Sequence, residues 1–176
     1  EIVKTKKRLL EKGFGPEILT IKQTNFANID EVAKEAGKFD FVLADLGVSS
    51  MQIDNPERGF SYKTEGLLDL RLDPEHGESA AQRLSHITKE EFIGMMVDNS
   101  DEPYAEEIAK VVFQKMSRGQ KIETTTDLKN AIEEALVCVP QKDRKEAVKK
   151  SCARVFQALR IDVNSEFDVL YSFLEK

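Results

Sequence analysis

Residues 39–50 have the sequence FDFVLADLGVSS, and this stretch decides the expected fold. Positions 41–44 are apolar without interruption. A strand that is apolar on both faces suits the centre of a parallel sheet, because helices cover both faces of such a sheet. Asp45 follows directly, at the sheet edge where ligands bind in open α/β folds. The stretch therefore predicts a central strand that delivers Asp45 to a binding site.

The residues before this strand alternate between helical and strand-like patterns. Residues 2–12 are typical of a helix, and Gly13 suits a left-handed cap at its end. Residues 18–21 form a short β-like run. Asn28 can cap a second helix, whose apolar residues recur at helical spacing until Gly37. Strand, helix and strand within this length predict a βαβ unit, and hence a doubly wound α/β sheet.

The middle of the chain has only helical patterns from Ser79 to about residue 150. Thr88 and Glu91 have the spacing of a capping box at a helix start. Three apolar faces at helical spacing follow: Phe92, Met95 and Met96; Ile108, Val111 and Val112; Leu128, Ile132, Ala135 and Leu136. A last long helix is expected to align Phe156, Leu159, Val163, Phe167 and Leu170. The block predicts an all-helical insertion into the sheet domain.

Composition limits the class of protein without fixing its function. The 176 residues are 40% hydrophobic and 33% charged, as in ordinary globular proteins, and no apolar run reaches the roughly 20 residues of a membrane span. We expect a cytoplasmic protein that has no membrane partner, with Cys138 and Cys152 as unpaired thiols. The net charge of −6 argues against a simple nucleic-acid coat, although residues 110–121 and 142–154 are locally basic. The basic stretches permit RNA binding or are solvated helix faces.

Several side chains are candidates for a site, each with a structural alternative. Asp45 could bind a ligand or cap the next turn, and Phe26 could stack on an adenine ring or fill a core. Residues 68–73 alternate strictly between leucine and charged residues, which predicts that the carboxylates and Arg71 share one face of an extended segment. No metal site is expected, because neither histidine stands at ligand spacing. These residues alone predict an α/β ligand-binding domain with a helical insertion.

Read together, the short motifs are more specific than any one of them. They are DLGVSS at 45–50, Gln52, ERGFS at 57–61, LDLRLD at 68–73, GESAA at 77–81, YAEE at 104–107, FQALRI at 156–161 and VNSE at 163–166. The set resembles the MraW methyltransferase family in content and order, over essentially the whole chain. The resemblance implies transfer of a methyl group from S-adenosylmethionine to N4 of a cytidine in small-subunit ribosomal RNA.

The resemblance also implies a fold and a division of the chain. The fold would be α/β, a Rossmann-like methyltransferase sheet, incomplete in this chain, with an all-helical inserted domain. Residues 1–73 would belong to the methyltransferase domain, residues 74–150 would be the substrate-recognition insertion, and residues 151–176 would return to the first domain. The family's glycine-rich loop would lie before residue 1, and further sheet after residue 176. The substrate would be the ribosomal RNA or the assembled small subunit, and a homo-oligomer remains open.

Site residues follow from the positions that match the family's motifs. Phe26, Asp45 and Gln52 would contact S-adenosylmethionine, and Asp45 is the best candidate for a residue at the reaction centre, although the proton acceptor stays open. Six further residues are substrate-binding candidates: Ser49, Ser50, Arg58, Arg71, Arg160 and Asn164. One departure is Ser151-Cys152, where the family often has His-Pro. Two alternatives stay open: an inactive RNA- or protein-binding piece, and a methyltransferase that acts on another substrate.

Overall fold

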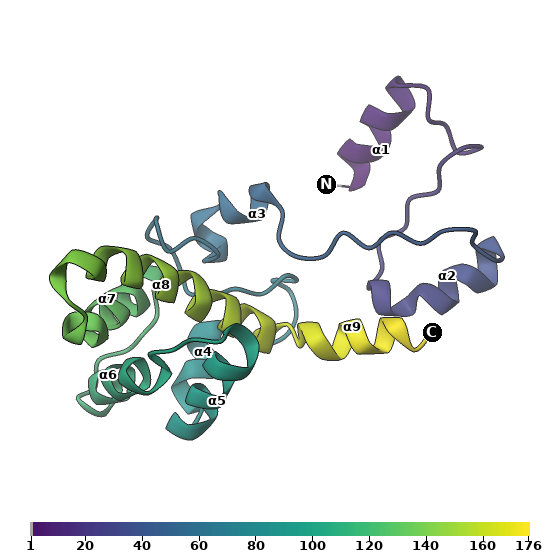
Figure 1. The fold of residues 1–176 in the computed structure, drawn as a ribbon. Coiled ribbons are helices and arrows are strands. Elements are labelled where there is room, and N and C mark those ends of the chain that lie inside the picture. Colours follow the sequence, from purple (N-terminus) through teal and green to yellow (C-terminus); the bar gives the residue numbers. More distant parts are fainter. Residues whose placement is uncertain (1) are drawn as a thin grey trace. The chain divides into compact units, whose positions relative to one another are not determined.

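The computed structural model describes residues 2–176, and its regular elements are helices (Figure 1). The chain divides into two compact units. The first contains the described residues up to Leu43 together with Asp168–Lys176, and the second contains Ala44–Phe167.

The first unit contains two of the expected helices. α1 (Ile2–Glu11) and α2 (Ile29–Ala36) confirm the helical patterns, and a 3₁₀ turn, η1 (Phe26–Asn28), precedes α2. Gly13 and Gly37 follow the two helices, each with φ of 87°, a left-handed value that glycine adopts at little cost. Asn28 stands at the start of α2 without a side-chain capping bond, whereas Asn25 caps η1.

The expected α/β fold with a Rossmann-like sheet is wrong for this chain. Residues 18–21 and 39–44 form no strand, and within residues 2–176 the one β-bridge pairs Leu67 with Thr124. Phe41 and Leu43 are 78% and 80% exposed, instead of buried as in a central strand. A strand satisfies its backbone groups only through a neighbouring strand, and neither segment has one among the described residues. An apolar run is therefore not sufficient to form a sheet here.

The second unit contains the predicted helical block, and the structure confirms its helices. Its elements in chain order are α3 (Ser50–Ile53), η2 (Pro56–Arg58), α4 (Ala80–His86), α5 (Lys89–Ser100), α6 (Ala105–Ser117), α7 (Thr125–Ala135), η3 (Leu136–Cys138) and α8 (Gln141–Val163). α5 packs on α8 and α6, and α7 packs on α6 and α8, so that the long helix α8 runs along the bundle (Figure 1).

Apolar residues at helical spacing form the core of this bundle. Phe92 and Met96 of α5, Ile108 of α6, Leu128 of α7 and Leu159 of α8 are fully buried. These positions belong to the apolar faces that the sequence predicts. Among the described residues, no helix combines the length and apolar character that crossing a membrane requires.

The expected last helix is interrupted. α8 ends at Val163 and α9 (Glu166–Leu174) begins three residues later, so Phe156 and Phe167 do not share one continuous helix. Ser165 between them has φ of 47°, which is left-handed and breaks the right-handed path. α8 itself runs without a break through residues 150 and 151.

Candidate functional site

Asp45 lies in an irregular segment that leads into α3. Its carboxylate is exposed and has no hydrogen-bond or ion-pair partner among residues 2–176. Gly47 follows with φ of 111°, a conformation that favours glycine, and turns the chain toward the helix. The Asp45 carboxylate is therefore available to accept hydrogen bonds from a ligand.

Ser49 and Gln52 are engaged with each other at the start of α3. The Gln52 Oε1 accepts hydrogen bonds from the Ser49 backbone nitrogen, at 2.9 Å, and from the Ser49 hydroxyl, at 3.1 Å. Ser50 is the exposed first residue of the helix. Gln52 therefore stabilises the turn after Asp45 through its oxygen, and its amide nitrogen has no hydrogen-bond partner among the described residues.

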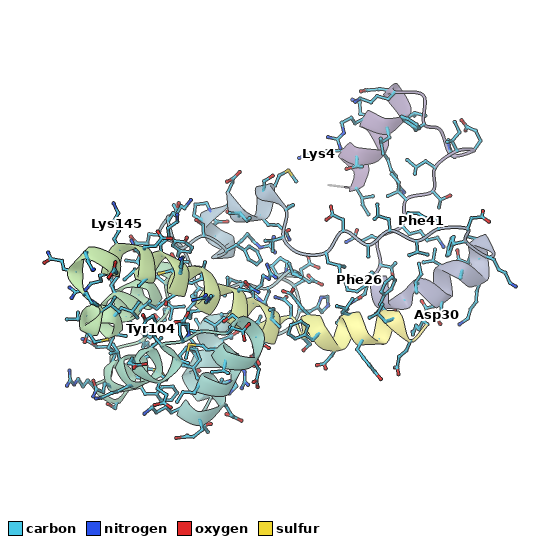
Figure 2. The ribbon with its side chains drawn as sticks, in the orientation of Figure 1. Lys4, Phe26, Asp30, Phe41, Tyr104 and Lys145 are labelled. Atoms are coloured by element: carbon cyan, nitrogen blue, oxygen red, sulfur yellow. The ribbon has the colours of Figure 1, made fainter. Side chains whose placement is uncertain are left out.

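Phe26 belongs to the first unit, whereas Asp45 and Gln52 belong to the second. Its ring packs edge-on against Phe173 of α9, with ring centroids 5.5 Å apart (Figure 2). The ring is 39% exposed, so part of it stays accessible. The three cofactor candidates are thus divided between the two units.

Residues 68–72 form a loop that Asn164 and Arg58 hold by its backbone. The Asn164 amide donates to the Leu70 carbonyl at 2.8 Å and accepts from the Leu72 nitrogen at 2.7 Å. Arg58 donates through one nitrogen to the carbonyls of Arg71 and Leu72, at 2.7 and 3.0 Å. Arg58 and Asn164, two substrate candidates from distant parts of the sequence, therefore lie together here. Both bind the backbone of the protein itself.

This loop requires such support because its backbone is unusual. Leu70 is buried and has φ of 63°, which is uncommon for a leucine. Gly59 is buried against the backbone of Leu67 and Asp69, where a Cβ would collide, and its own φ of 70° is also left-handed. The glycine of the ERGF motif is therefore needed for close approach of the two segments.

Arg71 is paired with Asp69 on the polar side of the loop. Its guanidinium donates to both carboxylate oxygens of Asp69, at 2.8 and 2.7 Å, and also to the Gly77 carbonyl. Burial raises the pKa of Asp69, but hydrogen bonds from Arg71 outweigh burial, so that the pKa lies below its ordinary value. Arg71 and Asp69 therefore lie on one side, as expected, but the segment is not the extended one predicted, because Leu70 between them has a left-handed φ.

A cavity of about 530 Å³ lies between residues 48–64 and α8, within the second unit. Phe60, Tyr62 and Phe156 supply aromatic surface, and the rings of Tyr62 and Phe156 meet edge to face at 5.8 Å. Lys63 and Gln157 supply polar groups at the same cavity, and neither side chain has a partner among the described residues. The cavity therefore combines ring faces with free hydrogen-bonding groups.

Arg160 lines this cavity and is the one substrate candidate that does so. Its guanidinium makes a bidentate pair with Glu166, at 2.7 and 3.1 Å. Nearby on α8, Arg83 of α4 pairs with Asp162 at 2.9 Å, and this hydrogen bond raises the pKa of Arg83. The end of α8 is thus fixed by paired charges, which orient Arg160 at the cavity.

Sequence reasoning did not assign Tyr62, Lys63 or Gln157 to a site. Phe60 and Tyr62 stand at alternate positions after the turn-rich ERGF motif, and Gln157 lies in the FQALRI motif. Neither pattern reveals that the two segments, almost a hundred positions apart, face one cavity. A planar ring with hydrogen-bonding edges suits such a cavity, because aromatic faces stack on it and polar groups recognise its edge.

No group of three or more His, Cys, Asp and Glu side chains converges as a metal-binding set within residues 2–176. Both cysteines are unpaired, and burial together with Glu133 raises the pKa of Cys152 to about 12.

Comparison with known proteins gives a consistent family. The family model described as the MraW methylase family matches residues 1–176. The chain is 66% identical to ribosomal RNA small subunit methyltransferase H 1 of Lachnoclostridium phytofermentans, over all of the chain and 48% of that protein. It is 62% identical to the protein of the same name from Agathobacter rectalis, over all of the chain and 50% of that protein.

A third relative, ribosomal RNA small subunit methyltransferase H 2 of Alkaliphilus metalliredigens, is 57% identical over the whole chain and half of its own length. The chain thus spans about half the length of the curated relatives that it matches. Because the family model covers every residue, this chain belongs to the MraW methylase family.

Proposed function

We propose that the complete gene product containing this chain transfers a methyl group from S-adenosylmethionine to N4 of a cytidine in small-subunit ribosomal RNA. The observation that carries the proposal is the match of the whole chain, at 57–66% identity, to relatives named ribosomal RNA small subunit methyltransferases. The substrate would be the RNA or the assembled small ribosomal subunit, in the cytoplasm.

Three residues of this chain have groups that suit binding of the methyl donor. S-adenosylmethionine supplies a methyl group on a positively charged sulfur, and the uncommitted carboxylate of Asp45 is a suitable group to face that charge. Gln52 can offer its amide nitrogen while its oxygen holds Ser49. Phe26 can offer the accessible part of its ring to the adenine. These are the three residues that we propose to contact the methyl donor.

The cytidine would be oriented by the second unit. Methylation of an exocyclic amine depends on alignment of the amine with the methyl group and on an acceptor for the released proton, so positioning is the main task of the protein. Arg160, with the aromatic groups of the cavity, would bind the base, and Ser49 and Ser50 would lie beside it. Asp45 is the proposed reaction-centre residue, and its carboxylate could orient the amine or accept the proton.

Arg58, Arg71 and Asn164 take a different role in this proposal. Their polar groups bind the backbone or side chains of this chain, as described above, so they would act on the substrate by holding residues 68–72 in place. For the division of labour, we propose that residues 74–150 recognise the substrate, while residues 1–73 and 151–176 belong to the methyl-transfer part.

Methyl transfer to undermethylated small ribosomal subunits tests the proposal. The complete gene product is incubated with labelled S-adenosylmethionine, and the RNA is digested to nucleosides. We expect labelled N4-methylcytidine, lost in Asp45→Ala and retained in Asp98→Ala, which removes an exposed carboxylate from α5. A label on another nucleoside, or on protein, would refute the cytidine assignment and favour a methyltransferase with another substrate.

A further inference from the structure

Three lysines lie along one face of α8 ahead of the cavity. Lys142, Lys145 and Lys149 stand at positions i, i+3 and i+7, and a helix with 3.6 residues per turn places these positions on one side. All three are exposed, and Lys145 lies near the N-terminal end of the helix (Figure 2). None has a hydrogen-bond or ion-pair partner among residues 2–176. We call these three residues the lysine stripe.

Two other basic side chains of the same helix segment are already engaged. Arg144 donates to the carbonyls of Val137 and Val139, and Lys150 lies 3.7 Å from the Glu146 carboxylate. The segment also carries two carboxylates, Asp143 and Glu146; Glu146 is paired with Lys150 and Asp143 is exposed beside Lys142, but the positive side chains outnumber them. The lysine stripe therefore keeps its positive charge available for an external anion.

The same face of α8 continues into the cavity. Ala153 follows Lys149 by four residues, and Phe156 and Arg160 follow at further helical spacings. All three of these later residues line the cavity. From Lys142 to Gln157 the helix rises about 22 Å, at about 1.5 Å per residue. An extended polymer that lies along this face of α8 would thus pass from the lysine stripe to the aromatic cavity.

We propose that the lysine stripe binds the phosphate backbone of a single-stranded RNA segment whose base enters the cavity beside Tyr62. This inference rests on the proposed function and names the surface that carries its substrate. Cationic side chains that follow a strand, next to aromatic rings that accept its bases, are the combination by which proteins bind single-stranded RNA. The chain as a whole carries a net charge of −6, so RNA attraction would be confined to such a local surface.

The test compares two variants that lose the same three positive charges. The stripe variant is Lys142→Gln, Lys145→Gln and Lys149→Gln. The control is Lys7→Gln, Lys12→Gln and Lys38→Gln, at exposed positions of the first unit, outside both basic stretches, whose side chains have no hydrogen-bond or ion-pair partner among the described residues. Binding of a labelled single-stranded RNA oligonucleotide to the complete gene product is measured by fluorescence anisotropy at several salt concentrations.

We expect the stripe variant to bind roughly tenfold more weakly at low salt, and the control to change by less than about twofold. The slope of log Kd against log salt should fall by about 2 in the stripe variant, because each phosphate contact with a single strand contributes about 0.7. Replacing the three lysines with arginine should preserve both affinity and slope, since the charges remain. Circular dichroism confirms that each variant is folded.

A separate variant tests the cavity. Tyr62→Ala should weaken RNA binding roughly tenfold without changing the salt slope, because stacking involves no counterion release. Tyr62→Phe should bind like the wild type, since the ring face is retained.

Equal effects in the stripe and control variants, an unchanged salt slope, or no RNA binding by the wild type would each overturn the inference. The experiments also distinguish failure of this inference from failure of the proposed methyl transfer. RNA that binds through the stripe but carries no methylated nucleoside would refute the methyl transfer alone. Equal methylation of ribosomal RNA by both triple variants would refute the RNA-binding role of the lysine stripe and leave the proposed methyl transfer intact.

Discussion

Asn164 connects segments that are more than ninety residues apart. Its side chain bonds the Leu70 carbonyl, the Leu72 nitrogen and the Arg160 carbonyl, and so joins the residue 68–72 loop to the end of α8. An amide suits this position because it offers a donor and an acceptor at once. A carboxylate of the same shape would place its charge against two carbonyl oxygens.

We therefore predict that Asn164→Ala lowers the free energy of unfolding by about 1–3 kcal/mol, because half-buried backbone groups lose their partners. Asn164→Asp should destabilise at least as much near neutral pH. Urea denaturation measures the change. Asn130→Ala on α7, which removes an exposed amide without a partner, should stay within about 0.5 kcal/mol of the wild type. A change no larger than that in Asn164→Ala would contradict the role of this residue.

The Asp69–Arg71 pair makes stability depend on acidity. Because the pKa of Asp69 is lower in the folded chain than its ordinary value of 3.8, the folded chain gains stability from the ionised carboxylate above that pH and loses it as the pH falls through the lowered pKa. We predict that Asp69→Asn is less stable than the wild type at pH 7, and that the difference narrows below about pH 3.8. Urea midpoints across this range measure the effect. A constant difference from pH 7 to pH 3 would exclude this explanation.

At the scale of elements, helix starts are set by short local motifs. Ser79 with Gln82, Thr88 with Glu91, and Thr124 with Asp127 all form reciprocal caps, in which each side chain bonds the backbone of the other residue. In the second of these, the backbone and hydroxyl of Thr88 lower the pKa of Glu91 through hydrogen bonds. Such caps satisfy backbone donors that the helix itself leaves open.

Thr88→Ala should therefore reduce the free energy of unfolding by about 1 kcal/mol, the usual effect of losing an N-cap oxygen. Thr88→Ser retains the oxygen and should remain close to the wild type. Thermal unfolding followed by circular dichroism at 222 nm compares the two variants. An equal loss in both would indicate that packing of the threonine methyl group, and not the cap, stabilises α5.

These caps explain why the sequence predicts the helical block well and the other elements badly. A helix closes its hydrogen bonds within four residues, so Thr88, Glu91 and the apolar residues after them suffice to predict α5. Residues 39–44 would need a distant strand, which their own sequence does not contain. Asn164, just after the end of α8, bonds Leu70, and the cavity is lined by both Tyr62 and Gln157. Contacts of this range leave no periodic pattern in the sequence.

At the scale of the whole molecule, the two units differ in how well they bury their apolar residues. Every fully buried large side chain of the described residues lies in the second unit. In the first unit, α1 and α2 contain no buried residue. A region with few buried contacts opens more readily than a packed core. We therefore expect the first unit to unfold more readily than the second.

Limited proteolysis should show this difference. Chymotrypsin cleaves after aromatic and leucine residues, and we predict that the first cuts fall at residues 39–43, where Phe41 and Leu43 are 78% and 80% exposed. Phe92 in the core of α5 should stay uncut until the second unit unfolds, because cleavage requires the backbone to leave the helix. Mass spectrometry identifies the products. Phe41→Ser with Leu43→Ser should slow the first cut and also reduce aggregation, since it removes exposed apolar surface. A first cut within α5–α8 would mean that the helical unit is the less stable of the two.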